Sequence, residues 1–257
     1  VVSALYLNGE AEPTERWVWP VRATSDEQTR PMTHLFTPAA AGKYLLIYNC
    51  EYKSDTSANN TINCKLNGNV IDTQSSTTRR PTDDFVSFAS IDVADCSASA
   101  QTATLTALKT SATVQYIRRA RIVAIRIPGG RFANAQDAAS DTQSTTTSTA
   151  FQQKLTKSWT PSAAGNWLFL GSARLNQTGT TYRVEAQAQL DNTTTSNTTA
   201  RQPEVASSYW NFNSVDVRNL TAASHFVDVD YRSTNASGTA AIRYAHFAAL
   251  PLNESGG

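Results

Sequence analysis

The chain repeats itself along most of its 257 residues. Residues 36–44 read FTPAAAGKY, and residues 159–167 read WTPSAAGNW, an offset of 123 positions. Ser90-Ile-Asp-Val93 returns as Ser214-Val-Asp-Val217, at an offset of 124. Because the offset stays nearly constant between distant segments, the pattern predicts two copies of one domain and not chance matches to a short motif.

The length suits two medium domains, each large enough for its own core. Pro128-Gly-Gly130 ends the last apolar segment of the first copy and is followed by polar residues, as expected at a domain boundary. The sequence therefore predicts an N-terminal arm used in assembly over residues 1–30, a first domain over 31–128, a linker over 129–148 and a second domain over 149–257.

The ordered-looking segments have the pattern of β-strands. Residues 44–50 and 122–127 of the first copy, and 226–231 of the second, are rich in β-branched and aromatic residues and are separated by clusters of turn residues. No segment has the period of a helix of three turns. Strands of this length bury one face against another sheet, so the sequence predicts an all-β chain of two antiparallel β-sandwiches.

The charge balance excludes some partners. Lys and Arg number 22 against 21 Asp and Glu, which gives a net charge of +1. So small a charge does not favour binding to nucleic acid or to an anionic membrane surface. No apolar run approaches the roughly 18 residues of a membrane span. We expect neither nucleic acid nor membrane as a partner.

Motifs that carry chemistry are missing from the sequence. His34, His225 and His246 lack the spacing of a metal site, and no nucleophile elbow, P-loop or dinucleotide fingerprint occurs. Asp228 and Asp230 alternate with valines and should point outward, but two carboxylates are too few for a dedicated calcium site. We therefore predict no enzymatic activity, no metal and no cofactor.

The three cysteines all lie in the first copy, as Cys50, Cys64 and Cys96. Their counterparts in the second copy are Ala173, Ala188 and Leu220. That exchange indicates small apolar core positions. A second interpretation is a disulfide between Cys50 and Cys64, which flank a predicted hairpin turn over residues 54–60 and would then lie on paired strands.

Two aromatic pairs are candidates for binding. Tyr209 and Trp210 could stack on a glycan, although the repeat aligns Trp210 with Val86 on an alternating apolar face, which favours a core position. Trp17 and Trp19 have no counterpart in the second copy. We expect them to dock the N-terminal segment on a domain or on a neighbouring subunit.

The start of each copy resembles a known family. Phe36-x-Pro-x-x-x-Gly42-x-Tyr44, an apolar strand and then Leu66-Asn-Gly68 are similar to the start of C1q- and TNF-like jelly-roll domains. The apolar segments at 120–127 and 245–252 resemble repeats in uncharacterised structural proteins of tailed bacteriophages. The resemblance implies two tandem jelly-roll-like domains that associate, commonly as trimers, in recognition or particle building rather than catalysis.

The N-terminal segment is similar to these closing strands. Its apolar residues match their pattern without a preceding domain, and they are Val2, Ala4, Leu5 and Leu7. An unpaired strand with an apolar face should add to a sheet edge, either in its own chain or in a neighbouring subunit. We expect Val2, Ala4, Leu5, Leu7, Trp17 and Trp19 to take part in assembly.

Two functions remain open at this point. The first is a structural protein on the surface of a virus particle, most simply a phage capsid decoration or fibre component that forms a homo-oligomer, a trimer, and contacts the major capsid or tail protein. The second is an extracellular filament or adhesin subunit that binds surface glycan. Seven N-x-Ser/Thr triplets favour the second function, and they begin at Asn59, Asn176, Asn192, Asn197, Asn219, Asn235 and Asn253.

Overall fold

The structure is a computed structural model, and it describes residues 21–23, 32–38, 40–54, 58–78, 86–109, 115–127, 132, 134–194, 199–201 and 209–252. The regular elements of this part are all β-strands. No helix within it is long and apolar enough to cross a membrane.

The first eight strands form one sandwich of two antiparallel sheets. They are β1 (Val21–Ala23), β2 (Met32–Phe36), β3 (Gly42–Ser54), β4 (Ala58–Leu66), β5 (Asn69–Thr78), β6 (Val86–Cys96), β7 (Gln101–Lys109) and β8 (Gln115–Arg126). One sheet has the order β1-β8-β3-β6 and the other has the order β2-β7-β4-β5.

The remaining strands form the second sandwich. They are β9 (Gln136–Ser140), β10 (Ser144–Thr146), β11 (Gln152–Trp159), β12 (Gly165–Gln177), β13 (Val184–Leu190), β14 (Thr193–Thr194), β15 (Thr199–Arg201), β16 (Trp210–Leu220), β17 (His225–Ser233) and β18 (Ala240–Pro251). The order β10-β18-β12-β16 makes one sheet, to which β9 adds through β18. The order β11-β17-β13-β14 makes the other, to which β15 adds through β13.

In both sandwiches the chain passes back and forth between the two sheets, and the first and last strands lie side by side. This is the jelly-roll arrangement, and the prediction of an all-β chain with two jelly-roll-like sandwiches is confirmed. The corresponding strands also agree in length: β3 and β12 each have 13 residues, and β6 and β16 each have 11.

The same two backbone irregularities occur in each sandwich. The hairpin after β4 turns at Asn67-Gly68 and the hairpin after β13 turns at Asp191-Asn192, and all four residues have positive φ, as a two-residue type I′ turn requires. A β-bulge interrupts the pairing of β3 with β8 and that of β12 with β18. The bulged strands carry Arg119 at φ 51° and Tyr244 at φ 47°.

The cysteines lie in the core of the first sandwich. Cys50, Cys64 and Cys96 are all buried, which confirms the assignment to small apolar core positions, and all three are free thiols. The disulfide predicted between Cys50 and Cys64 is not formed. The chain does not make a hairpin between β3 and β4 but crosses from one sheet to the other, so the two residues do not lie on paired strands.

Two predicted boundary segments contain strands. β9 and β10 fall within residues 129–148, the predicted linker, and both pair with β18 in the second sandwich. β1 falls within the predicted arm over residues 1–30 and pairs with β8 in the first sandwich. Short polar strands such as Ser144–Thr146 carry too little apolar pattern to be recognised from sequence.

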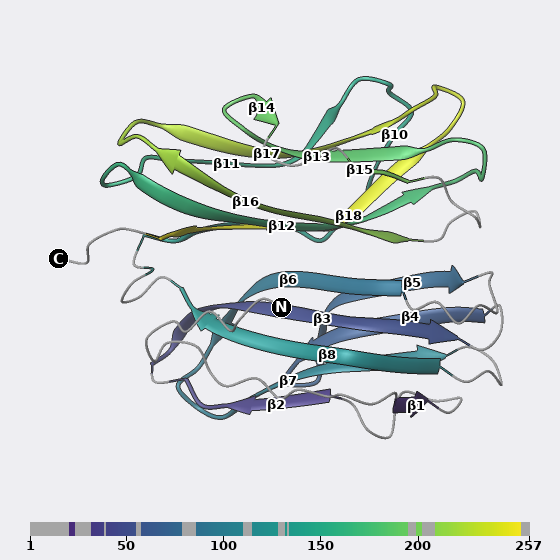
Figure 1. Ribbon diagram of the computed structural model, residues 1–257, viewed down its shortest axis with the longest axis horizontal. Helices are drawn as coiled ribbons and strands as arrows, with labels where there is room; N and C mark the ends of the chain where they lie inside the picture. Colours follow the sequence, from purple (N-terminus) through teal and green to yellow (C-terminus); the bar gives the residue numbers. More distant parts are fainter. Residues whose placement is uncertain are drawn as a thin grey trace.

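The two sandwiches are stacked sheet against sheet. The sheet that contains β6, β3 and β8 faces the sheet that contains β12, β18 and β16 (Figure 1). A separate apolar cluster, which we call the seam, fills the space between them. Its buried members are Leu45, Ile91, Ile125, Ile127, Phe132, Ala135, Ala248 and Leu250, and Ile47, Val93, Val123, Leu168 and Leu170 pack against them.

Candidate functional site

The bulge at Tyr244 decides which residues of β18 reach the seam. Before the bulge, Ile242 points into the core of the second sandwich. After it, Ala245 points into that core, while Ala248 belongs to the seam. One extra residue reverses the alternation along a strand. The bulge therefore turns the even-numbered residues, His246 among them, toward the first sandwich.

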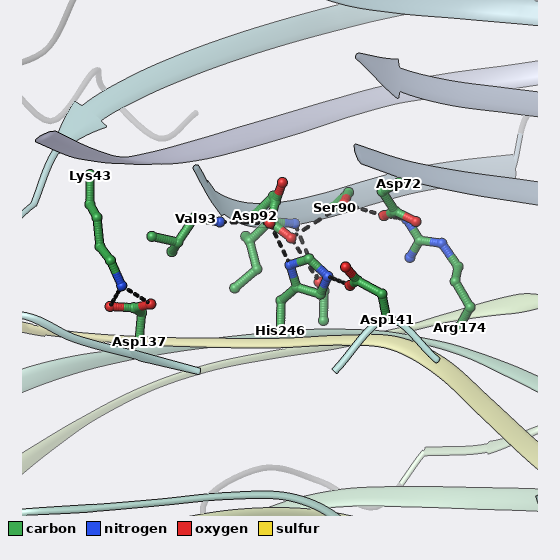
Figure 2. A network of polar contacts seen from close by, with 11 residues as sticks. Lys43, Asp72, Ser90, Asp92, Val93, Asp137, Asp141, Arg174 and His246 are labelled. Carbon is green, nitrogen blue, oxygen red and sulfur yellow. Dashed lines mark hydrogen bonds and ion pairs between the residues drawn. The ribbon is translucent and has the colours of Figure 1, made fainter. Parts of the chain in front are cut away.

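His246 lies in the seam between two carboxylates (Figure 2). Its Nε2 is 2.7 Å from Oδ1 of Asp141, in the loop after β9, and its Nδ1 is 2.9 Å from Oδ1 of Asp92 on β6. Only 3% of the imidazole side chain is exposed. Because an ionised carboxylate only accepts hydrogen bonds, a ring with one on each side carries a proton on both nitrogens.

The protonation of His246 follows from a competition between burial and charge. Burial disfavours the imidazolium, but the hydrogen bond to Asp141 and the contact with Asp92 outweigh it and raise the pKa of His246 to about 9. The same hydrogen bond lowers the pKa of Asp141. At neutral pH the seam therefore holds a buried cation that joins Asp92 of one sandwich to His246 of the other.

A second buried ion pair crosses the seam beside the first. Arg174 on β12 reaches into the first sandwich and pairs with Asp72 on β5, and the two side chains are 0% and 2% exposed. Ser90 donates a further hydrogen bond to the same carboxylate oxygen. The guanidinium also donates to the carbonyl of Ala89 at 3.3 Å and lies 4.8 Å from the centre of the Phe88 ring.

Two further polar contacts cross the seam. Lys43 on β3 pairs with Asp137 on β9 at 2.9 Å, nearer to solvent. The backbone N–H of Ile91 donates to the hydroxyl of Ser172 at 3.3 Å. Each of these contacts joins one sandwich to the other, so the polar cluster of Figure 2 fixes the relative position of the two jelly rolls.

A different cluster has the composition of a catalytic triad. His225, at the start of β17, has Nδ1 2.6 Å from Oδ2 of Asp191 and Nε2 3.3 Å from the hydroxyl of Thr221. The other oxygen of Asp191 accepts the backbone N–H of Phe226 at 3.0 Å. Acid, imidazole and hydroxyl in this order are also the components of nucleophilic catalysis.

The first sandwich has the same cluster without an acid or an imidazole. At an offset of 124, Asn67 donates to Gln101 at 2.6 Å, and Gln101 donates to the hydroxyl of Ser97 at 2.9 Å. The backbone N–H of Thr102 donates to Asn67, as that of Phe226 does to Asp191. An amide version in the same place cannot do acid–base chemistry. We therefore interpret both clusters as clamps that hold the positive-φ turn after β4 or β13 against the loop before β7 or β17.

Converting one clamp into the other should change stability little. We expect the double variant Asp191→Asn, His225→Gln to unfold within about 1 kcal/mol of the wild type, because each hydrogen bond has an amide equivalent. The variant His225→Ala should lose about 1–2 kcal/mol, since it leaves partners unsatisfied. Urea unfolding of the three proteins measures this. Equal losses in the double variant and the alanine variant would contradict the clamp interpretation.

The predicted glycan-stacking pair is engaged within the protein. Arg243 lies 3.7 Å from the centre of the Tyr209 ring, and the Tyr209 hydroxyl donates to Gln143. Trp210 is half-buried at the start of β16, opposite Leu175 of β12. The arrangement covers one face of the Tyr209 ring with a guanidinium, so a sugar could approach only the other.

The two aspartates of β17 were expected to point outward. Asp228 and Asp230 do alternate with the core residues Val227 and Val229, but both are buried, and they accept hydrogen bonds from Gln153 at 2.9 Å and from Gln187 at 3.4 Å. Burial raises the pKa of Asp230, and the charge of Asp228 adds to this effect. The described residues contain no group of three or more His, Cys, Asp or Glu that could hold a metal ion.

The predicted assembly residues lie outside the described part of the chain. They are Val2, Ala4, Leu5, Leu7, Trp17 and Trp19. Their role stays a prediction.

The polar residues of the seam were not found by sequence reasoning. Arg174 and His246 lie in strands of apolar and small residues, where a charge is unusual, and the repeat aligns them with Glu51 and Arg121. Charged residues that differ between the copies within a buried strand were the signal that could have indicated an interface between the domains.

Comparisons with known proteins do not identify a family. No protein-family model and no curated protein matches the chain. Similar solved structures include PNGF-II, at 10% identity over 93% of this chain and 65% of that one with a TM-score of 0.37. The MCP of the virus STIV matches at 10% identity over 93% and 97% of the two chains with a TM-score of 0.30.

A third solved structure is the tandem CBM22 domain of Paenibacillus barcinonensis Xyn10C. It matches at 8% identity over 90% of this chain and 87% of that one with a TM-score of 0.28. The chain spans less than two thirds of the length of the PNGF-II chain, at 65%. Scores this low assign neither function nor partner, so a functional conclusion must rest on the residues themselves.

Proposed function

We propose that this chain is a non-enzymatic structural protein of a virus particle, a capsid decoration or fibre component of a tailed bacteriophage exposed on the virion surface. It forms a homo-oligomer, a trimer, through its sandwich faces and its N-terminal strand, and contacts the major capsid or tail protein. The observation that carries this proposal is the seam, which joins two jelly rolls into one building block.

The seam supports a structural role because it is filled. Substrate sites of two-domain proteins often lie in the cleft between the domains. Here apolar side chains such as Leu45, Ile125 and Leu250 occupy that position, and they are at most 6% exposed. Buried ion pairs at Arg174 and His246 fix the orientation of the sandwiches.

The paired clamps support the absence of catalysis. His225 with Asp191 is the arrangement in the described residues that most resembles a catalytic one, and the first sandwich makes the same contacts with Gln101 and Asn67. A fold repeats its structural contacts, whereas chemistry lies in sites added to the fold.

Immunoelectron microscopy tests the proposal. Antibodies against the full chain, labelled with gold, are applied to virus particles and to cells from a culture of the source organism. We expect gold on the capsid or tail of the particles. Gold confined to cell-surface filaments would overturn the proposal in favour of the extracellular filament or adhesin, and particles without gold would also overturn it.

A further inference from the structure

Two valines of the second sandwich are unusually exposed. Val215 and Val217, on β16, have 69% and 51% of their surface accessible. They alternate with Asp216 and Arg218, which pair with one another on the other face of the strand at 2.8 Å. The strand therefore presents an apolar side and a charged side.

In the first sandwich the two equivalent positions are covered by the second sandwich. Ser214-Val-Asp-Val217 corresponds to Ser90-Ile-Asp-Val93, and Ile91 and Val93 belong to the seam. The second sandwich thus keeps the apolar residues of an interface strand, but nothing in the described part of the chain covers them.

The exposed valines continue the seam. Val217 lies opposite Leu168 and Val215 lies opposite Leu170 in the pairing of β16 with β12, so all four share one face of the sheet. The two leucines pack against the seam and are themselves only partly buried. An apolar surface therefore runs from the seam out to the edge of this sheet.

β16 is also an edge strand. Among the described strands it pairs only with β12, along all of its 11 residues. Its other side presents backbone N–H and C=O groups that can pair with a strand of another chain. The N–H of Val217 donates to Oδ1 of Asp216 at 2.8 Å, and strand pairing would replace this bond. β16 lacks the prolines and bulges that normally block such pairing, although its charged residues Asp216 and Arg218 lie on the same face as the core residues Phe212 and Leu220.

The charged side of β16 is complementary to itself. If two copies of the strand pair antiparallel about a two-fold axis centred on Val217, each Asp216 lies opposite Arg218 of the second copy. Centring on Asp216 would place two carboxylates opposite each other, which is unfavourable. The existing Asp216–Arg218 pair is exposed and weak, so exchanging partners costs little.

We infer that β16 binds β16 of a second copy of this chain, antiparallel and centred on Val217, so that two second-sandwich sheets become one. This inference rests on the proposed function. Because a two-fold contact cannot lie within a three-fold symmetric trimer, the β16 contact joins subunits of two neighbouring trimers. The interface is isologous, as a two-fold contact between identical subunits must be.

Disulfide trapping tests the register. Paired strands place opposite Cα atoms about 4.5–5.5 Å apart, within the range of a disulfide. The full-chain variant Val217→Cys should therefore form a covalent dimer under mild oxidation. The matched controls Val70→Cys and Leu35→Cys, at positions 50% and 66% exposed on other strands, should stay uncrosslinked. The native cysteines are buried and should not interfere.

Charge reversal provides a second measurement on the same contact. Arg218→Asp should weaken dimer formation about tenfold in sedimentation velocity, because it places two pairs of like charges opposite each other. The double variant Asp216→Arg, Arg218→Asp should restore it. Circular dichroism confirms that each variant is folded. Equal dimerisation of the single and double variants would overturn the register.

The possible failures can be told apart. If Val217→Cys stays uncrosslinked while a lysine-reactive cross-linker still captures oligomers, the β16 contact is wrong and the proposed function stands. If the controls crosslink as fast as Val217→Cys, random collision explains the dimer and the inference is overturned. Gold labelling of particles reports on the proposed function independently of either result.

Discussion

Replacing Arg174 by Met is expected to lower the free energy of unfolding by about 3–5 kcal/mol, because it leaves the carboxylate of Asp72 buried without a counter-charge. Asp72 is 2% exposed, and water cannot replace the guanidinium without opening the seam. Urea unfolding followed by tryptophan fluorescence measures the loss.

The matched control removes both charges of this pair. The double variant Arg174→Met, Asp72→Leu should recover most of the lost stability. Its two apolar side chains, of similar volume, pack together and leave no unpaired charge buried. The exposed pair of Lys43 with Asp137 offers a comparison, and Lys43→Met should cost less than about 1 kcal/mol. An Arg174 loss as small as the Lys43 loss would show that the pair does not hold the seam.

The second large effect is a fall in stability above neutral pH, caused by His246. The pKa of its side chain is about 9 in the folded protein and about 6.5 in an unfolded chain. A raised pKa stabilises the fold fully below pH 6.5, and the stabilisation is lost as the pH rises toward 9. A shift of this size corresponds to about 3 kcal/mol. About 2 kcal/mol of it should disappear between pH 6.5 and 8.

Urea unfolding at intervals from pH 6 to pH 8 checks this expectation, and this range stays below the pKa of about 8.5 of a cysteine in an unfolded chain. The variant His246→Gln should be less stable than the wild type at pH 6, and its free energy of unfolding should no longer fall as the pH rises from 6.5 to 8. A wild-type slope that persists in this variant would assign the pH dependence to other groups. Asp141 does not contribute to this slope. Its pKa is lowered, so its contribution to stability is lost only as the pH falls into the acid range.

The fold could be predicted because the repeat and the alternating strand pattern both indicate the same core positions. Residues 36–44 and 159–167 lead into the central strands β3 and β12, and their aromatic residues Phe36, Tyr44, Trp159 and Trp167 are buried. Cys64 and its counterpart Ala188 are likewise core residues. Such positions obey local alternation, which the sequence displays directly.

The polar sites could not be predicted because they depend on how the two copies pack. His246 reads as an isolated polar residue until the bulge at Tyr244 turns it toward Asp92. Asp72 and Arg174 are about a hundred residues apart and share no motif. The hairpin expected between Cys50 and Cys64 failed for a related reason, since a turn between two strands does not reveal whether they pair or cross between sheets.

The position of β18 within its sheet has a consequence for the order in which the protein can be assembled during synthesis. β18 lies between β12 on one side and β9 and β10 on the other, yet the ribosome makes it after all of them. Until it emerges, β12 is paired only with β16, and the seam lacks Ala248 and Leu250. The first sandwich is complete once β8 is made, so its apolar seam face stays exposed until β18 has been synthesised. During that interval a chaperone or a neighbouring nascent chain can bind this face.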